Sequence, residues 1–140
     1  MEKRTLKGHP YMQAKVWISD NGTTEILESY STSVVFKRGG EVAKEMFDGF
    51  SLNVKEYYEC TGLFSRTTIK HISLYCREND ISYCVLKLIA GTSWAYLIAE
   101  NANPYKLYFY NFNSGEVLEI TNNDLLHHYK KIKNYIDKND

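Results

Sequence analysis

The chain has 140 residues, which is enough for one domain that buries roughly two thirds of the surface its unfolded form exposes. Its 17 Lys and Arg residues balance 17 Asp and Glu residues, so no overall field draws it to a polyanion, and a nucleic-acid site would have to be a local patch. The three cysteines, Cys60, Cys76 and Cys84, lack CxxC spacing, which argues against a disulfide framework and a cysteine-rich zinc site.

The first half of the chain alternates apolar and polar residues between turn signals, a pattern typical of strands. Residues 14–18 and 24–28 are predicted to pair, because Asp20-Asn21-Gly22 between them tolerates the positive φ angles of a hairpin turn. Residues 30–37 predict another strand, and residues 42–47 are expected to pair back onto it. Residues 55–60 are expected to form a strand rather than a short helix.

Residues 65–78 contain the clearest helix start in the chain. Ser65 is a good N-cap, since its hydroxyl can accept from backbone N–H groups that have no partner within the helix. Ile69, Ile72 and Cys76 recur at helical spacing and predict the side that faces the core. The opposite side predicts a mainly cationic ridge with His71 beside it, formed by Arg66, Lys70, Ser73 and Arg77.

The second half of the chain is expected to return to strands. Residues 81–90 and 93–99 predict an apolar hairpin around Gly91-Thr92, and residues 105–112 and 116–120 predict a further pair. A final helix is predicted over residues 122–137, with Thr121 or Asn122 as its cap.

This order of elements predicts an α+β fold in a single domain, residues 1–140. Most of it is expected to be antiparallel β-sheet. Two helices, at about 65–78 and 122–137, are expected to pack on one face of that sheet.

The sequence contains no recognisable catalytic constellation, so an enzyme is not expected. Gly39-Gly40 lacks the Lys-Ser or Lys-Thr that follows in a phosphate-binding loop. His127 and His128 are neighbours on a predicted helix and point about 100° apart, so they are poorly placed to chelate one ion. No metal and no cofactor are therefore expected.

The segment from Thr61 to Lys70 resembles the turn and recognition helix of helix-turn-helix DNA-binding proteins. That motif needs a small residue where Tyr58 stands, and Phe64 lengthens the turn by one residue. Both features favour a structural amphipathic helix, and the choice between the two depends on whether residues 55–60 form a helix or a strand.

A second resemblance covers about residues 30–78. Residues 30–35 (YSTSVV), Tyr58 and residues 65–72 (SRTTIKHI) are similar to the pattern Y-x-T-x-V … S-x-T-T-x-x-H of small uncharacterised proteins from phages and other mobile elements. Genes of this size in mobile elements often encode inhibitors of host defence, including anti-CRISPR proteins. The resemblance therefore implies a protein that evades host defence.

The leading hypothesis is a non-enzymatic, cytoplasmic binding protein that inhibits a bacterial defence complex, with a CRISPR effector nuclease as the expected target. The alternative is a nucleic-acid-binding regulator that uses helix 65–78, with Tyr57, Tyr58 or Tyr75 stacking on bases. A structural component that oligomerises through sheet edges is a third reading. The binding residues expected from the sequence are Arg66, Lys70, His71, Arg77, Tyr57 and Tyr58.

Overall fold

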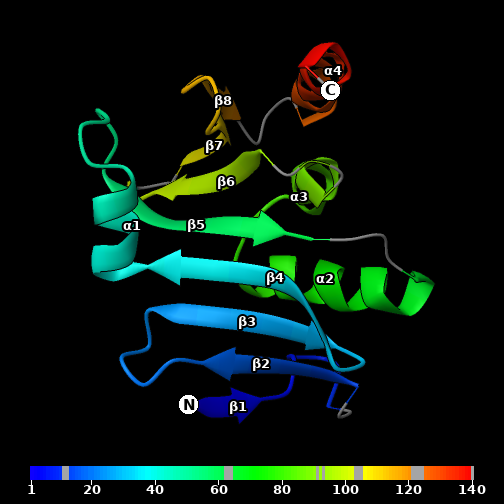
Figure 1. Ribbon diagram of the computed structural model, residues 1–140. Coiled ribbons are helices and arrows are strands. Elements are labelled where there is room, and N and C mark those ends of the chain that lie inside the picture. Colours follow the sequence, from blue (N-terminus) through cyan, green and yellow to red (C-terminus); the bar gives the residue numbers. More distant parts are fainter. Residues whose placement is uncertain are drawn as a thin grey trace.

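A computed structural model describes residues 1–10, 13–61, 65–90, 92, 94–102, 106–120 and 125–139, with the side chains of 125–129 and 139 left out of the description (Figure 1). The strands are β1 (Glu2–Arg4), β2 (Ala14–Ile18), β3 (Thr24–Ser29), β4 (Thr32–Gly39), β5 (Val54–Cys60), β6 (Ala95–Glu100), β7 (Lys106–Asn111) and β8 (Val117–Ile120). The helices are α1 (Gly40–Met46), α2 (Arg66–Glu78), α3 (Tyr83–Ala90) and α4 (Leu125–Asn139).

The eight strands form one antiparallel sheet whose order follows the chain from β1 to β8. The predicted hairpin at residues 20–22 joins β2 to β3, with Gly22 at φ +73° and Asn21 Oδ1 accepting from the Thr23 backbone N–H. The predicted strand at 55–60 is confirmed as β5. β5 pairs with β6 although α2 and α3 lie between them in the sequence.

Helices α2, α3 and α4 cover one face of the sheet, and in Figure 1 α2 lies behind β3 and β4. The large core lies between these helices and the sheet, because Ile72, Leu86 and Ile132 from the three helices meet Leu97 and Phe109 from the strands. The opposite face has a smaller cluster at its α1 end, where Ala43 and Phe47 pack against residues of β5, β6 and β7. We call the two sides the helix side and the open side.

The fold class is confirmed as α+β with an antiparallel sheet, but the expectation of two helices was wrong, since four are described. Residues 83–90 form α3 instead of a strand, because Val85, Leu86 and Ile89 bury one helical face and Ser82 Oγ accepts from the Val85 N–H at 3.4 Å. A short apolar run does not distinguish a buried strand from a buried helix.

Residues 40–46 form α1 instead of a strand that pairs with β4. Gly40 has φ +59°, which ends β4 in a conformation that only glycine adopts easily. Ala43 and Phe47 then lie one helical turn apart and are both buried. α1 also adds a helix on the side of the sheet that was expected to have none.

The predicted cap of α2 is confirmed, because Ser65 Oγ accepts from the Thr68 N–H at 3.2 Å. The final helix is confirmed as α4, while its expected cap, Thr121 or Asn122, lies outside the described residues. The element that precedes α2 is β5, a strand, so the helix-turn-helix resemblance is not supported by the fold. No helix in the described ranges has the length and apolar character needed to cross a bilayer.

Candidate functional site

Three residues of the predicted cationic ridge are exposed on α2. Arg66, Lys70 and Arg77 all point away from the core, as their spacing on the helix predicts. None of them forms an ion pair with another described residue. They are therefore available to a partner.

His71 is not part of this exposed ridge, because it is fully buried beneath α2. Its Nδ1 lies 2.8 Å from Ser29 Oγ, and its Nε2 lies 3.1 Å from His9 Nε2. Ser29 is itself buried and also contacts Thr68 Oγ1 at 3.1 Å. The Ser29–His71 pair is thus a core contact that joins β3, α2 and the N-terminal segment.

The buried histidine predicts that stability falls in mild acid. Burial lowers the pKa of His71 below its ordinary value of 6.5, and the nearby His9 and Lys70 lower it further. Between the folded pKa and 6.5 the unfolded chain binds more protons, so the free energy of unfolding rises with pH across this window. The contribution of His71 to stability is fully present above pH 6.5 and is lost as the pH falls from 6.5 through the pKa of the folded state.

Urea denaturation at about pH 7.5 and about pH 5 should therefore show a drop in the free energy of unfolding. A His71→Gln variant should have a lower free energy of unfolding at the higher pH. Its free energy of unfolding should fall less than that of the natural protein when the pH is lowered. An equal loss in both proteins would show that other groups set the acid sensitivity.

The tyrosines proposed to stack on bases are buried. Tyr58 and Tyr75 lie in the core between the sheet and the helices, and Tyr57 is 5% exposed on the open side. The adjacent residues Tyr57 and Tyr58 face opposite sides of the sheet, as side chains on a strand must. Tyr58, His71 and Tyr57 are therefore too buried to form the predicted binding surface.

A charged cluster lies beneath the C-terminal end of α2. Lys37 Nζ is 3.3 Å from Glu56 Oε2 and 3.8 Å from Glu25 Oε1, and it donates to Asn79 Oδ1 at 2.8 Å. Tyr75 donates its hydroxyl proton to Glu25 Oε1 at 2.7 Å, and burial together with that carboxylate raises its pKa. Since Asn79 caps α2, these contacts fasten the helix to β3, β4 and β5.

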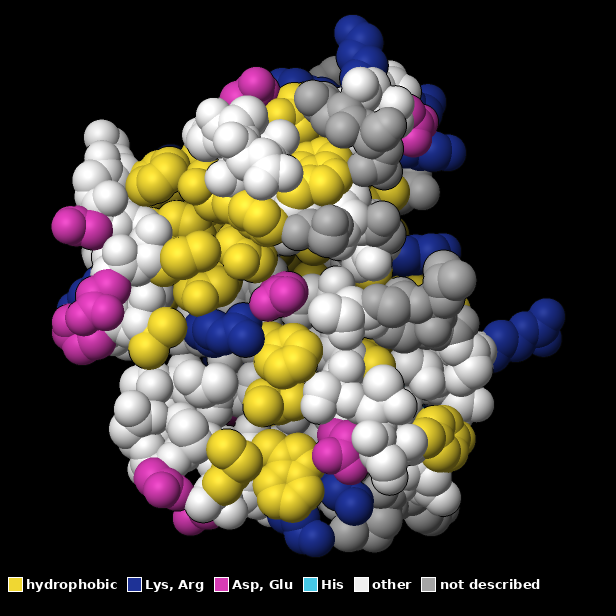
Figure 2. Space-filling view, in the orientation of Figure 1, with side chains coloured by type: hydrophobic (Ala, Val, Ile, Leu, Met, Phe, Trp, Pro, Cys, Tyr) yellow, Lys and Arg dark blue, Asp and Glu magenta, His cyan; other side chains and the backbone are white. Residues whose placement is uncertain are grey.

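The open side of the sheet has a row of mostly apolar side chains that crosses the strands. Trp17 on β2 is directly opposite Ile26 on β3, Ile26 is opposite Phe36 on β4, and Phe36 is opposite Glu59 on β5. All four are partly exposed. Figure 2 shows hydrophobic side chains gathered over the middle of this side, with a basic and an acidic side chain next to each other among them.

The row continues across β6 and the residue after β7. The rings of Tyr96 and Phe112 stack with centroids 4.8 Å apart, and both are partly exposed. At its α1 end this stretch borders the smaller cluster, against which Tyr96 and Phe112 pack. We call this surface the aromatic face and define it as Trp17, Ile26, Phe36, Arg38, Glu59, Tyr96 and Phe112.

One ion pair lies within the aromatic face. Arg38 Nη1 donates to Glu59 Oε2 at 3.1 Å, and the Arg38 guanidinium lies 5.1 Å from the centroid of Phe36 and 5.9 Å from that of Tyr57. These two cation–π contacts hold the guanidinium over aromatic side chains of the sheet. Its side chain and that of Glu59 remain partly exposed, at 28% and 37%.

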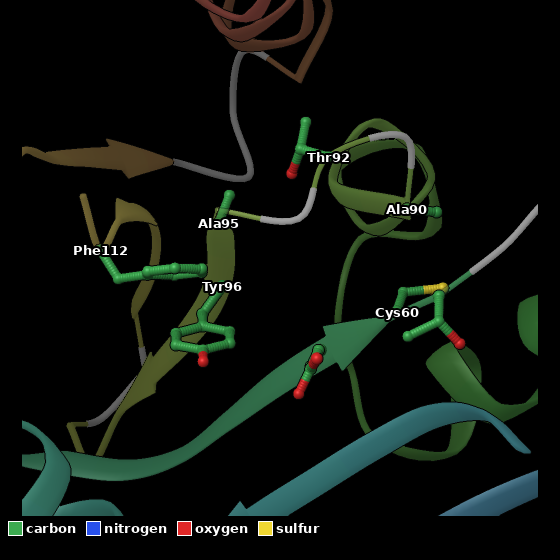
Figure 3. A pocket seen from close by; sticks show the side chains of 8 residues that line it. Cys60, Ala90, Thr92, Ala95, Tyr96 and Phe112 are labelled. Atoms are coloured by element: carbon green, nitrogen blue, oxygen red, sulfur yellow. The ribbon is translucent and has the colours of Figure 1, made fainter. Parts of the chain in front are cut away.

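A pocket of about 250 Å³ opens where β5 and β6 separate. Their last paired residues are Tyr58 and Leu97, while β5 stays paired with β4 as far as Cys60 and β6 stays paired with β7 back to Ala95. In Figure 3, Tyr96 and Phe112 lie on one side of the space and Cys60 and Ala90 on the other. Its lining is Glu59, Cys60, Thr61, Ala90, Thr92, Ala95, Tyr96 and Phe112.

Among the described residues that line the pocket, Glu59 is the one acidic or basic side chain; the others contribute aromatic rings, hydroxyls, methyl groups and the thiol of Cys60. Burial raises the pKa of Cys60 to about 12, so its sulfur is a neutral thiol at physiological pH. Burial also raises the pKa of Tyr96, and there the effect of Glu59 exceeds the opposing effect of Arg38. Because Arg38 pairs with Glu59 Oε2, the other carboxylate oxygen, Oε1, is the one left for a cation in the pocket.

Sequence reasoning missed the aromatic face because its members come from five strands and one turn. The available signal was the alternation in residues 14–18, which places Trp17 on the side away from the buried Ala14 and Val16; residues 32–39 do not alternate and gave no such signal for Phe36. Whether these positions share a row depends on the register between strands, and the bulge at Val34 of β4, between the Leu27–Val35 and Glu28–Ser33 pairs, changes that register.

Within the described residues, no three His, Cys, Asp or Glu side chains are grouped as a metal site would require. Among the described residues, the contact between His9 and His71 therefore lacks the third ligand that a metal site would need. Comparison of the chain with protein-family models, with curated proteins and with solved structures found no match.

Proposed function

We propose that this protein is a non-enzymatic binding protein and that its aromatic face contacts a partner protein. The observation that carries the proposal is the row of partly exposed side chains from Trp17 to Tyr96. With strands about 4.8 Å apart, this row spans about 19 Å from β2 to β6. Aromatic residues and Arg are enriched in protein interfaces, where a few of them supply most of the binding free energy.

The pocket indicates the chemistry of the partner. Its carboxylate, Glu59, lies beside the stacked rings of Tyr96 and Phe112, which together suit the flat cation of an arginine side chain. An acidic side chain would be repelled by Glu59. We therefore expect a partner segment that places apolar side chains on the row and one basic side chain in the pocket.

The class of partner follows from the sequence resemblance. Residues 30–35 and 65–72 are similar to proteins of phages and mobile elements, for which inhibition of host defence is a common role. We propose a bacterial defence complex as the partner, with a CRISPR effector nuclease as the first to be tested. The protein would block that complex by occupying a surface it needs.

The proposal predicts that variants of the aromatic face lose inhibition. In an assay of target cleavage by purified effector nucleases, Trp17→Ala and Phe36→Ala should each raise the inhibitor concentration needed by roughly 30-fold, the equivalent of about 2 kcal/mol for a central interface residue. Glu59→Gln should weaken inhibition by about tenfold, since it removes the charge but keeps the shape of the pocket wall.

Two matched controls separate this surface from others. Tyr30→Ala removes an aromatic side chain that is 53% exposed but lies in the turn before β4, so it should leave inhibition unchanged. A double variant, Arg66→Glu with Lys70→Glu, tests the ridge on α2. Loss of inhibition in that variant alone, with full inhibition by Trp17→Ala and Phe36→Ala, would move the interface to the helix side. Each variant needs a circular dichroism spectrum to show that it is folded.

A further inference from the structure

The helix side of the molecule is strongly basic, although the whole chain is neutral. Helices α2, α3 and α4 contain eight Lys or Arg residues and two acidic residues, an excess of six positive charges. The rest of the chain therefore has nine Lys or Arg residues and fifteen acidic ones, an excess of six negative charges. The eight cations are Arg66, Lys70, Arg77, Lys87, Lys130, Lys131, Lys133 and Lys138.

These cations lie on neighbouring helices, because α3 contacts both α2 and α4 on the same side of the sheet. All eight side chains are exposed, and none forms an ion pair with a described residue. Lys and Arg side chains project along the right-hand edge of Figure 2, where Figure 1 places the three helices. We call this surface the basic layer.

Of the two acidic residues on these helices, Glu78 does little to neutralise the layer, whereas Asp137 is exposed and offsets part of the charge of α4. Glu78 has only 6% of its side chain exposed, and its carboxylate pairs with Arg4 Nη1 at 2.8 Å and accepts from the Lys7 N–H at 3.0 Å. Asp137 is the other, near the end of α4. Concentrated charge of one sign, with its counter-charges elsewhere in the chain, creates a local field despite the neutral total.

From this charge segregation we infer that the basic layer binds the phosphate backbone of double-stranded nucleic acid. Arg66 and Arg77 alone are about 16 Å apart along α2, a length of duplex that carries about nine phosphates. Such contacts position a protein on the duplex without reading its sequence. The inference stands apart from the aromatic face, which lies on the other side of the sheet.

Other anionic partners fit the layer less well. The exposed large hydrophobic side chains in the described part of the chain are Met1, Tyr30, Val42 and Met46, and none of them lies on α2, α3 or α4. An amphipathic surface that enters a bilayer needs such side chains beside its basic residues. Single-stranded nucleic acid is bound largely by stacking on exposed aromatic rings, which the described side chains of the layer do not offer.

The test is a fluorescence-anisotropy titration of the full chain with a mixed-sequence duplex of about two helical turns. We expect binding at low salt, with the logarithm of the association constant falling against the logarithm of the salt concentration at a slope between about −4 and −7. The triple variant Lys70→Glu, Lys87→Glu and Lys131→Glu takes one cation from each helix. It should bind at least tenfold more weakly, with a slope shallower by about 2.7.

The matched control is Lys44→Glu, Lys55→Glu and Lys106→Glu. It produces the same net charge, but its exposed lysines lie on α1, β5 and β7. It should bind the duplex nearly as well as the natural chain. Equal losses in the two triple variants, no binding at low salt, or a slope near zero would overturn the inference. So would tighter binding to polyglutamate, to single-stranded DNA or to phosphatidylserine vesicles than to the duplex.

Discussion

Replacing Lys37 by methionine is expected to lower the free energy of unfolding by about 3 kcal/mol, because it removes the more buried of the two ammonium groups that pair with the buried carboxylate of Glu56. Glu56, whose side chain is 8% exposed, would lose the ammonium 3.3 Å away, and Glu25 would lose the same partner at 3.8 Å. Asn79 Oδ1 would also lose the hydrogen bond that it accepts from Lys37 Nζ, and this loss would weaken the attachment of α2 to the sheet. Chemical denaturation measures this change directly.

Lys55→Met is the matched control for this substitution. Lys55 also lies 3.5 Å from Glu56, but its side chain is 51% exposed, and exposed pairs contribute about 0 to 1 kcal/mol. Adding Glu56→Gln to Lys37→Met should recover part of the loss, because the neutral amide no longer needs a cation and can still accept from the Tyr58 hydroxyl. Equal effects of Lys37→Met and Lys55→Met would contradict the role given to the buried cluster.

Gly40→Ala is expected to destabilise the protein by about 2 to 3 kcal/mol. A residue with φ +59° is in the left-handed region, which costs roughly 1 to 2 kcal/mol for an amino acid with a Cβ atom. The new Cβ would also meet Thr23 Cγ2 at 2.8 Å, so that side chain or the start of α1 would have to move. Because α1 begins at Gly40, the displacement would reach Phe47 and the small core on the open side.

Two comparisons separate the strain from the clash. Gly49→Ala introduces the same kind of backbone strain, at φ +91°, but its new Cβ has no atom within 4 Å. It should lower the free energy of unfolding by about 1 to 2 kcal/mol. Thr23→Ser removes the obstructing methyl group but keeps the hydroxyl that donates to Asn21 Oδ1, and it should recover part of the Gly40→Ala loss. No recovery would mean that strain alone accounts for the effect.

The two proposed surfaces lie on opposite sides of one sheet. The aromatic face is built on β2 to β6 and the turn after β7, whereas the basic layer is built on the three helices behind that sheet. A protein partner and a nucleic acid would therefore not compete for the same residues. If the target is a defence nuclease, both surfaces could contact its ribonucleoprotein or substrate complex at once.

Several elements could be predicted from the sequence because their signals are local. Asn21 and Gly22 mark the hairpin between β2 and β3, and Ser65 marks the first turn of α2 through one side-chain contact. The spacing of Ile132 and Ile136 marks the buried side of α4. Each of these signals involves residues within one or two turns of one another, so the rest of the fold does not alter it.

The remaining features depended on contacts between distant segments. Residues 83–90 are helical because their apolar side fills the space between β5, β6 and α4, a space that does not exist until the sheet has formed. His71 and Lys70 are adjacent in sequence, yet His71 is buried because Ser29 and His9, 42 and 62 residues away, supply its hydrogen-bonding partners. Periodicity alone placed it beside the ridge.

The sequence by itself determined the α+β class, the hairpin of β2 with β3 and the cationic side of α2, because residue propensity and periodicity act over a few residues. Only the tertiary structure decided which tyrosines are buried, which strand residues align into the aromatic face, and that α3 and α4 extend the charge of α2. Burial and register are set by which segments pair and pack, and a single change of register would move every side chain of a strand to the other side of the sheet.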